Sequence, residues 1–323
     1  MNNSKETYLE IFHSIDFNEI KKHPNILIAA NFWEEERFRA AKVCYRLMRE
    51  IDDMIDDYKS VNPGISKNAG MEFKDIIRVW MNKFRKNGAG FNNTQLTEMF
   101  NAFKIPVWPF REFAESMNFD IDHSGFSTLQ QFIDYSQGAS VAPASVFVHL
   151  CGVKKKNHNY YKPDFNVRKA ATPCAMFSYI VHIIRDFQID QKNNLNYFAG
   201  DMLRKFEISE SDLRYMANDG KVNENFREMA GEYMALAEQY MNKTCRIIRE
   251  IWPLLDERYR LSLLIIFNLY RLAFEKIDIK NGNFTQVELE PSASEIRERV
   301  LKVISEFDPE YYRDKIFMAT QPD

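Results

Sequence analysis

The chain has 323 residues, of which 45% are hydrophobic and 28% charged, and its formal net charge is −3. This composition is typical of a globular protein with a large core, and the charge gives no electrostatic basis for binding nucleic acid. The most apolar run, Leu261 to Phe274, is too short to span a bilayer, and Met1 to Glu10 lacks the apolar core of a signal peptide. The four cysteines show no CxxC spacing, which favours thiols in a reducing compartment. We therefore expect a cytoplasmic protein whose contact with membranes is at most peripheral.

Helical periodicity runs through nearly the whole sequence. It first becomes clear over Glu34 to Tyr58, where one stripe is apolar: Cys44, Met48, Ile51 and Ile55. Further long helices are predicted over Leu129–Leu150, Val167–Gln191, Asn223–Ile251 and Glu257–Ile277. Glycine and proline are scarce, at 11 each, and mark joints at 62–64, 87–90 and 281–283. No segment reads as alternating strands, so we predict an all-α helical bundle that forms a single domain over residues 1–323.

The helix over 34–58 carries a polar stripe beside its apolar one. Tyr45, Arg49, Asp52 and Asp56 are spaced four, three and four residues apart, so they lie on one face of the helix. Two interpretations are open: the stripe lines a cleft where the aspartates bind metal, or it is a solvated acidic face. Asp53 and Asp57, one residue further around the helix, would be the solvated set.

A second acidic stripe lies on the helix predicted over 167–191. Its members follow helical spacing: Ala175, Tyr179, His182, Asp186 and Asp190. Their neighbours are apolar, and an unpaired buried carboxylate is costly, so Asp186 forms either an internal ion pair, for instance with Arg271, or part of a functional site. Two carboxylate pairs that face each other across a cleft need positive charge between them. Hard divalent cations that bridge a phosphorylated substrate usually supply it.

Three shorter segments also bear on the fold and on possible ligands. The small side chains of Tyr135–Ser145 would admit a long, thin ligand or simply allow close helix packing, and Pro143 should bend or interrupt the helix. Lys154–Lys156 is interpreted as a solvated loop. Gly88–Gly90 lacks the third glycine and the preceding strand of a dinucleotide fingerprint, and no other motif bears on a nicotinamide cofactor such as NADPH.

The order of these motifs resembles the squalene and phytoene synthase family, the head-to-head trans-prenyltransferases. The resemblance covers about residues 23–277, with 278–323 as divergent C-terminal helices. The segments that carry it are Arg39–Asp57, Pro109–Asp122, Tyr135–Pro143, Ile183–Asp190, Asn196–Phe198 and Asp201–Leu213. Each segment alone is a weak signal, but all of them in this order and at these separations are specific.

The resemblance implies an isoprenoid-synthase bundle around a central cavity. It implies Mg²⁺, or Mn²⁺ in its place, held by Asp52 and Asp56 on one side and by Asp186 and Asp190 on the other. The activity implied is head-to-head condensation of two prenyl diphosphates, farnesyl or geranylgeranyl, with release of diphosphate. Tyr135 would lie near the cationic centre. The implied substrate-binding residues are Tyr45, Arg49, His182, Arg185, Ala139, Ala142 and Tyr270, of which the two alanines would line a tunnel for the isoprenoid tail.

Several positions depart from the family pattern, and all of them are polar positions around the diphosphates. His182 stands where the family has a metal-holding asparagine, and an imidazole suits softer metals than Mg²⁺. The other departures are Tyr179 for a glutamine, Gly125-Phe126 for an arginine-tyrosine pair, Asn283–Glu288 without the expected arginine, and His23–Leu27 without a serine-phenylalanine pair. Because both aspartate pairs survive, a divergent enzyme is favoured. The alternatives are a terpene synthase or prenyltransferase with another acceptor, a non-catalytic isoprenoid-binding protein, and an all-α protein with simple salt bridges.

Overall fold

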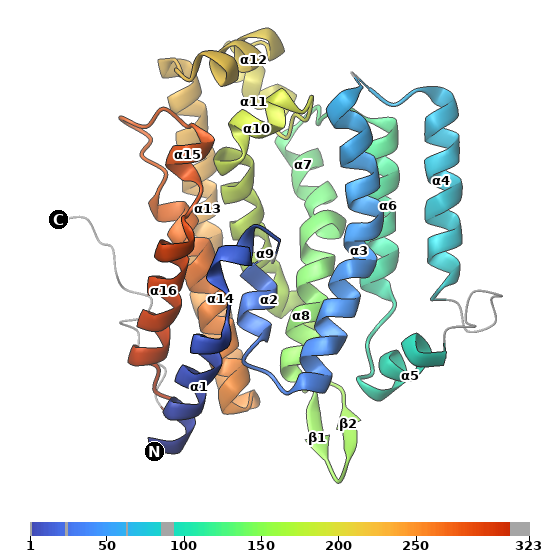
Figure 1. Cartoon of the computed structure of the whole chain (residues 1–323). Coiled ribbons are helices and arrows are strands. Elements are labelled where there is room, and N and C mark those ends of the chain that lie inside the picture. Colours follow the sequence, from blue (N-terminus) through green and yellow to red (C-terminus); the bar gives the residue numbers. More distant parts are fainter. Residues whose placement is uncertain (1, 23–24, 63, 85–93, 311–323) are drawn as a thin grey trace.

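The computed structural model describes residues 2–22, 25–62, 64–84 and 94–310, and within these ranges the regular secondary structure is helical apart from one short hairpin (Figure 1). The first half of the fold consists of α1 (Asn2–Ser14), η1 (Phe17–Lys22), α2 (Asn25–Ala30), α3 (Glu35–Val61), α4 (Lys67–Asn82), α5 (Thr94–Ala102), α6 (Trp108–Asp122), α7 (Leu129–Ser136), η2 (Gln137–Val141), α8 (Ala142–Gly152), β1 (Lys154–Lys156) and β2 (Asn159–Tyr161). The second half consists of α9 (Val167–Arg185), α10 (Phe187–Lys192), α11 (Gly200–Lys205), α12 (Glu210–Asp219), α13 (Glu224–Ile251), η3 (Trp252–Leu254), α14 (Glu257–Glu275), α15 (Gln286–Leu289) and α16 (Ala293–Glu306). The all-α prediction is confirmed.

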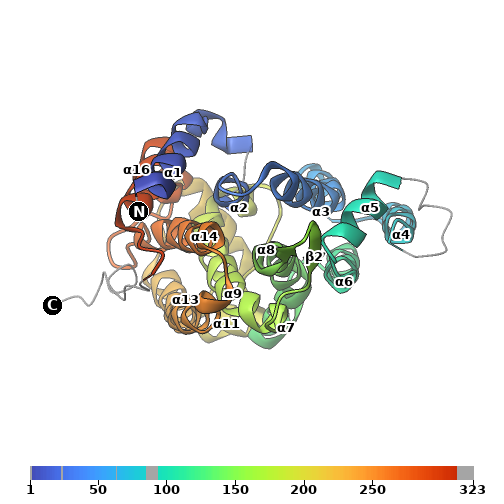
Figure 2. The ribbon, with the colours of Figure 1, turned by 90° about the horizontal axis from the view of Figure 1, so that it is seen from below.

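The long helices form one bundle with α9 near its centre. Seen along the bundle in Figure 2, α9 lies among α8, α13 and α14, while α3 and α6 continue the layer beyond α8. One hydrophobic core runs through the described residues, from Tyr8 in α1 to Ile304 in α16. None of the helices in the described ranges is long and apolar enough to cross a membrane. The bundle is therefore a single all-helical domain.

Helix α3 has the register that the sequence predicts. The four residues of its apolar stripe, Cys44 to Ile55, are each at most 5% exposed. The helix begins with Glu35 and Glu36 in its first turn, where negative charge is favourable, and runs for 27 residues. Its length carries the acidic stripe to the end of the bundle at which α10 lies (Figure 1).

The predicted helix over 129–150 is present, with a π turn where Pro143 was expected to interrupt it. The turn, η2, joins α7 to α8, and Pro143 sits in the first turn of α8. A wider turn accommodates the missing N–H of the proline without ending the helix. Gly138 lets η2 pack tightly on α6, because a Cβ at this position would lie 2.2 Å from Ser116 Oγ. The expected interruption is thus a local widening of the helix.

Two other predictions about secondary structure are correct only in part. The helix predicted over 167–191 breaks at Asp186, whose φ of −90° and ψ of 2° separate α9 from α10. Lys154–Lys156 is a strand that pairs with Asn159–Tyr161, and it is not a loop. Asn157 and His158 make this hairpin possible because both take positive φ, 48° and 65°, as a two-residue hairpin turn requires.

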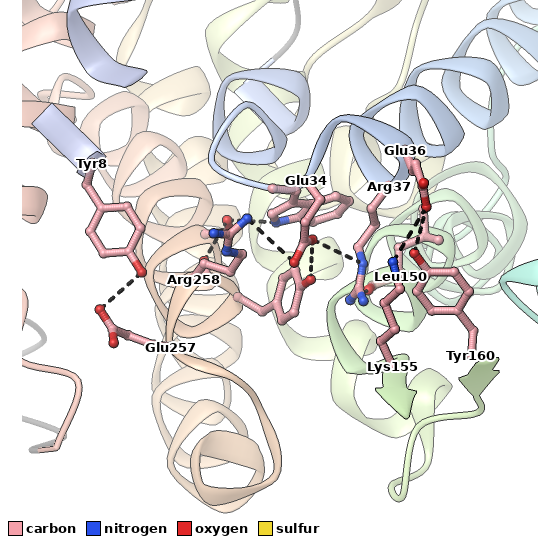
Figure 3. Close-up of polar contacts among 12 residues, drawn as sticks. Tyr8, Glu34, Glu36, Arg37, Leu150, Lys155, Tyr160, Glu257 and Arg258 are labelled. Atoms are coloured by element: carbon pink, nitrogen blue, oxygen red, sulfur yellow. Dashed lines mark hydrogen bonds and ion pairs between the residues drawn. The ribbon is translucent and has the colours of Figure 1, made fainter. Parts of the chain in front are cut away.

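A polar network holds together the end of the bundle where α3 and α14 begin (Figure 3). At its centre, Arg37 is 2% exposed; its Nη1 donates to Leu150 O at 2.7 Å, and its guanidinium lies 4.1 Å from the ring centre of Tyr259. Tyr259 in turn donates to Glu34 at 2.5 Å. The outer contacts are Tyr8 with Glu257, Arg258 with Glu34, and Tyr160 and Lys155 with Glu36. This network links α1, α3, α8, α14 and the hairpin, so it fixes the helices at this end.

Candidate active site

A cavity of about 960 Å³ runs through the bundle between α3, α8, α9, α13 and α14. All four aspartates of the two predicted pairs line it: Asp52, Asp56, Asp186 and Asp190. Its other walls are largely apolar and include Ile248, Ile251, Leu263 and Ile266. The cavity therefore combines a carboxylate-rich region with an apolar body, as a ligand with a charged head and a hydrocarbon tail would require.

The first carboxylate pair is partly buried on α3. The Asp52 side chain is 24% exposed and that of Asp53 is 51% exposed, so the expected division into a lining set and a solvated set holds. Arg49 donates to both of these carboxylates. Burial, together with the charges of Asp52 and Asp120, raises the pKa of Asp56 to about 7. The first pair thus carries more negative charge than its surroundings neutralise.

The second pair lies at the junction of α9 and α10. Arg185 binds both oxygens of Asp186, with Nε to Oδ1 at 2.7 Å and Nη2 to Oδ2 at 2.6 Å. The alternative pairing of Asp186 with Arg271 is wrong, since Arg271 pairs with Glu275 on its own helix. The break at Asp186 preserves the predicted spacing because Asp190 N still donates to Asp186 O at 2.8 Å.

The two pairs repel each other across the cavity. Burial raises the pKa of Asp190 well above its usual range, and the charges of Asp186, on the same segment, and of Asp56, on α3, add to the effect. A carboxylate on one helix can raise the pKa of a carboxylate on another only where the two are close. The tertiary structure therefore brings the two sequence motifs into one electrostatic site.

The donors at this site suit a hard divalent cation. They are carboxylate oxygens whose mutual repulsion a cation would relieve, and Mg²⁺ prefers oxygen ligands. In the described part of the chain, no three His, Cys, Asp or Glu side chains gather closely enough to hold a metal alone. Mg²⁺ is usually bound by one or two carboxylates together with water and phosphate oxygens, so it does not require three protein ligands. The carboxylates present therefore fit Mg²⁺.

The remaining predicted site residues are gathered in the same cavity, with one exception. Those that line it are Tyr45, Arg49, Tyr135, Ala139, His182, Arg185 and Tyr270. Ala142 does not line it and is fully buried. The π turn explains this correction, because its wider turn rotates Ala142 away from the cavity and brings Pro143 and Ala144 to the lining face instead.

His182 is held in the cavity wall as a neutral imidazole. Burial and the neighbouring Arg185 lower its pKa to about 3. Its Nε2 is buried without a hydrogen-bond partner, and its ring meets that of Tyr270 edge-on at 5.6 Å. An uncharged ring in this position adds no positive charge for a diphosphate.

The sequence pattern missed Asp120 and Lys59. Tyr135 Oη donates to Asp120 Oδ2 at 2.6 Å, and Lys59 Nζ lies 3.7 Å from Asp120 Oδ1. Burial raises the pKa of Asp120 to about 6, although Lys59 and the Tyr135 hydroxyl act in the opposite direction. Asp120 lies in a segment that carries the family resemblance, but it has no carboxylate partner at helical spacing that could have singled it out.

The C-terminal segment borders the cavity without supplying the arginine expected from the family pattern. Val287, Glu290 and Pro291 line the cavity beside the start of α16. Glu290 brings negative charge, which acts on Arg185 and contributes to raising the pKa of that guanidinium. Arg49 and Arg185 are thus the arginines that line the cavity within the described residues.

Comparisons with known proteins agree with this architecture. The squalene/phytoene synthase family model matches residues 21–296. The chain is 22% identical over 261 residues to chloroplastic phytoene synthase 2 of Solanum lycopersicum, a match that covers 78% of this chain and 76% of that protein. It is 21% identical over 256 residues to chloroplastic phytoene synthase 1 of the same species, covering 78% of this chain but 57% of that protein.

Two solved structures share the fold. A dehydrosqualene synthase in complex with ligand superposes with a TM-score of 0.64 at 15% identity, covering 94% of this chain and 98% of that one. YisP from Bacillus subtilis subsp. subtilis strain 168 superposes with a TM-score of 0.59 at 15% identity, covering 92% and 96%. At such low identity these likenesses speak for the fold alone.

Proposed function

The chain belongs to the squalene/phytoene synthase family, and on this premise we propose that it is a prenyltransferase that joins two prenyl diphosphates head to head and releases diphosphate. The single observation that carries the proposal is the meeting of Asp52 and Asp56 with Asp186 and Asp190 in one cavity that has an apolar body. Farnesyl and geranylgeranyl diphosphate are the proposed substrates. The cavity volume of about 960 Å³ lies at the upper end of the range for small-molecule sites, which supports long substrates.

Each lining group has a distinct proposed task. Asp52, Asp56, Asp186 and Asp190 would hold Mg²⁺, or Mn²⁺ in its place, which when bound would neutralise the diphosphate as it departs. Arg49 and Arg185, each oriented by an aspartate, would position the diphosphate oxygens. The apolar walls would hold the isoprenoid tails and exclude water from the allylic cation left behind.

Aromatic rings extend the polar end of the cavity toward its apolar body. Tyr45, Tyr135, Tyr179 and Tyr270 line the wall there, and the faces of such rings stabilise cations. Burial keeps the pKa of Tyr135 well above its usual range, so its phenol is neutral and does not quench the cation as a phenolate would. We assign Tyr135 to the reacting centre on these grounds.

A second candidate function is supported by the departures from the family pattern. His182 is a neutral imidazole and Glu290 stands in the region where an arginine was expected, so the site has less positive charge for a second diphosphate. In this alternative the protein ionises one prenyl diphosphate and transfers the cation to another acceptor or cyclises it. Product mass distinguishes the two functions.

The test is diphosphate release from farnesyl and geranylgeranyl diphosphate with Mg²⁺ and with Mn²⁺, followed by mass spectrometry of the products. A doubled-chain product is expected. Asp52→Asn with Asp186→Asn should abolish release, while Asp57→Asn, on the exposed side of α3, serves as the control. Absence of release from either substrate with either metal would refute the proposal and leave an isoprenoid-binding protein.

We also propose that the protein works in the cytoplasm and contacts a membrane only peripherally; the proposed substrates and products are lipids, which favours such contact. Val287, which lines the cavity, is 92% exposed. Sedimentation with phosphatidylcholine vesicles should retain the native chain and lose a fraction of Val287→Asp. Equal sedimentation of the two proteins would contradict this role for Val287.

A further inference from the structure

A second cavity, polar and about 270 Å³ in volume, lies beside the last turns of α3 and α6. Leu195 and Tyr197 line both this cavity and the main one, so a single layer of side chains separates the two. Other lining residues, including Asp122, His123 and Ser124, are exposed. The second cavity therefore opens at the surface and offers a polar route toward the wall of the main one.

One hydrogen bond crosses this wall. Tyr135 lines the main cavity and Asp120 lines the second one, and Tyr135 Oη donates to Asp120 Oδ2 at 2.6 Å. Lys59, which also lines the second cavity, places its ammonium 3.7 Å from the other oxygen of Asp120. The side chains of Lys59 and Asp120 are 12% and 16% exposed, so the contact is largely shielded from solvent.

This arrangement fixes what Tyr135 can offer to the main cavity. A phenol has one proton, and here that proton is committed to Asp120, so only oxygen lone pairs remain for a group in the cavity. The ammonium of Lys59 favours the ionised form of Asp120, whereas Asp52, on α3, disfavours it. Tyr135 is thus held as a hydrogen-bond acceptor toward the cavity, with a carboxylate behind it that can take its proton.

We propose that Tyr135 and Asp120 form a proton outlet for the condensation, an inference that rests on the function proposed above. In that reaction the allylic C–O bond breaks, and its electron pair leaves with the diphosphate. The double bond of the second substrate attacks the cation, and the new cation must lose a proton from carbon so that the C–H electron pair closes a cyclopropane ring. Tyr135 Oη accepts this proton while passing its own to Asp120, which releases it into the second cavity.

In this scheme Asp120 and Lys59 are positioning residues that act through Tyr135. Neither contributes to ionisation of the first substrate, which depends on the carboxylate pairs and the arginines. Loss of Asp120 as a proton acceptor should therefore leave diphosphate release largely intact and divert the doubled-chain cation from ring closure to capture by water or to loss of a different proton. The predicted signature is a change in the partition of products, which a general loss of packing would not cause.

The experiment uses the full chain with farnesyl and geranylgeranyl diphosphate and Mg²⁺, and compares released diphosphate with the amount of doubled-chain product that carries the cyclopropane ring. Asp120→Asn keeps the shape and can still accept the Tyr135 hydrogen bond, but it cannot take the proton. We expect release within about threefold of the native rate and a fall of at least about tenfold in the cyclopropyl fraction, with doubled-chain alcohols or alkenes that lack the ring in its place. Glu115→Gln, on the exposed side of the same helix and outside both cavities, should retain the native partition.

Tyr135→Phe supplies a second variant, and thermal unfolding checks that each protein is folded. Tyr135→Phe should shift the partition of products in the same direction as Asp120→Asn. Combining the two substitutions should cause no further change, because both groups act in one relay. The proposed proton outlet would be refuted if diphosphate release and the cyclopropyl product fell in proportion, or if Asp120→Asn kept the native partition of products. Either result would favour the departing diphosphate as the proton acceptor. If the native chain releases no diphosphate, the proposed function itself fails and takes this inference with it.

Discussion

Replacing Asp56 with asparagine should stabilise the protein at pH 8 in the absence of metal and diphosphate. Burial and the charges of Asp52 and Asp120 raise the pKa of Asp56 to about 7, from an ordinary value of 3.8. A carboxyl whose pKa is higher in the folded chain than in the unfolded chain opposes folding once it is ionised. Its destabilising effect therefore grows as the pH rises from 3.8 through 7 and is complete above that value.

The size of the effect follows from this difference in pKa. The full linkage at pH 8 is about 4 kcal/mol. Asp56 lines the cavity and is partly exposed, so solvent screening reduces the destabilisation that its charge causes. We therefore expect about half of the full value, or about 2 kcal/mol. For a chain of this length the entropy of unfolding is about 0.7 kcal/mol/K, so Asp56→Asn should raise the Tm at pH 8 by about 3 °C.

The assay is thermal unfolding of the native chain, Asp56→Asn and the control Asp57→Asn between pH 5 and pH 8. The advantage of Asp56→Asn should shrink toward pH 5, and Asp57→Asn should follow the native chain because Asp57 is exposed. Adding Mg²⁺ with inorganic pyrophosphate should reverse the order of the native chain and Asp56→Asn, because Asp56→Asn lacks one of the four carboxylates that would hold the metal. A native chain that is as stable as Asp56→Asn at pH 8 would refute the electrostatic reasoning.

Three further predictions concern packing and specificity. Gly138→Ala should lower stability by about 2–3 kcal/mol in thermal or denaturant unfolding, because the added Cβ would lie 2.2 Å from Ser116 Oγ. Gly64→Ala, where a Cβ meets nothing within 4 Å, is the control and should leave the Tm unchanged within about 1 °C. His182→Asn replaces a buried, unpartnered imidazole with the amide of the family pattern, so diphosphate release with Mg²⁺ should increase relative to that with Mn²⁺; an unchanged ratio would contradict a role in metal preference. Ala139→Leu adds bulk to the cavity wall and should reduce turnover of geranylgeranyl diphosphate relative to farnesyl diphosphate by about tenfold, and an equal loss for both substrates would argue against a tail-binding role.

Helical spacing identifies each acidic motif in the sequence. Only the structure shows that the two motifs face the same cavity. Asp52 and Asp56 share a helix face because four residues make about one turn. The same reasoning placed Asp186 and Asp190 together, and it survived the break at Asp186 because the hydrogen bond between the two residues remains. Nothing in either segment alone indicates that the pairs repel each other, which depends on how α3 packs in relation to α9 and α10.

The sequence-based predictions fail where packing between helices changes the local geometry or brings distant residues together. Ala142 was expected to line the cavity by regular helical spacing, but the π turn before Pro143 rotates it into the core. The lysines at 154–156 suggest a solvated loop, and the turn residues of the hairpin, Asn157 and His158, are less distinctive than an Asn-Gly pair, so the sequence does not indicate the strand pairing. Asp120 was missed because its partners, Lys59 and Tyr135, lie on other helices.

The sequence by itself determined the helical class, the apolar and polar faces of the long helices, and the aspartate pairs. Each of these depends on spacing within a single segment, where the period of the helix fixes which side chains share a face. The tertiary structure decided that the two pairs share one cavity, that Asp186 pairs with Arg185, and that Tyr135 reaches Asp120 across a wall between two cavities. Side-chain contacts between helices depend on crossing angles and on the packing of many residues, which no spacing along the chain records.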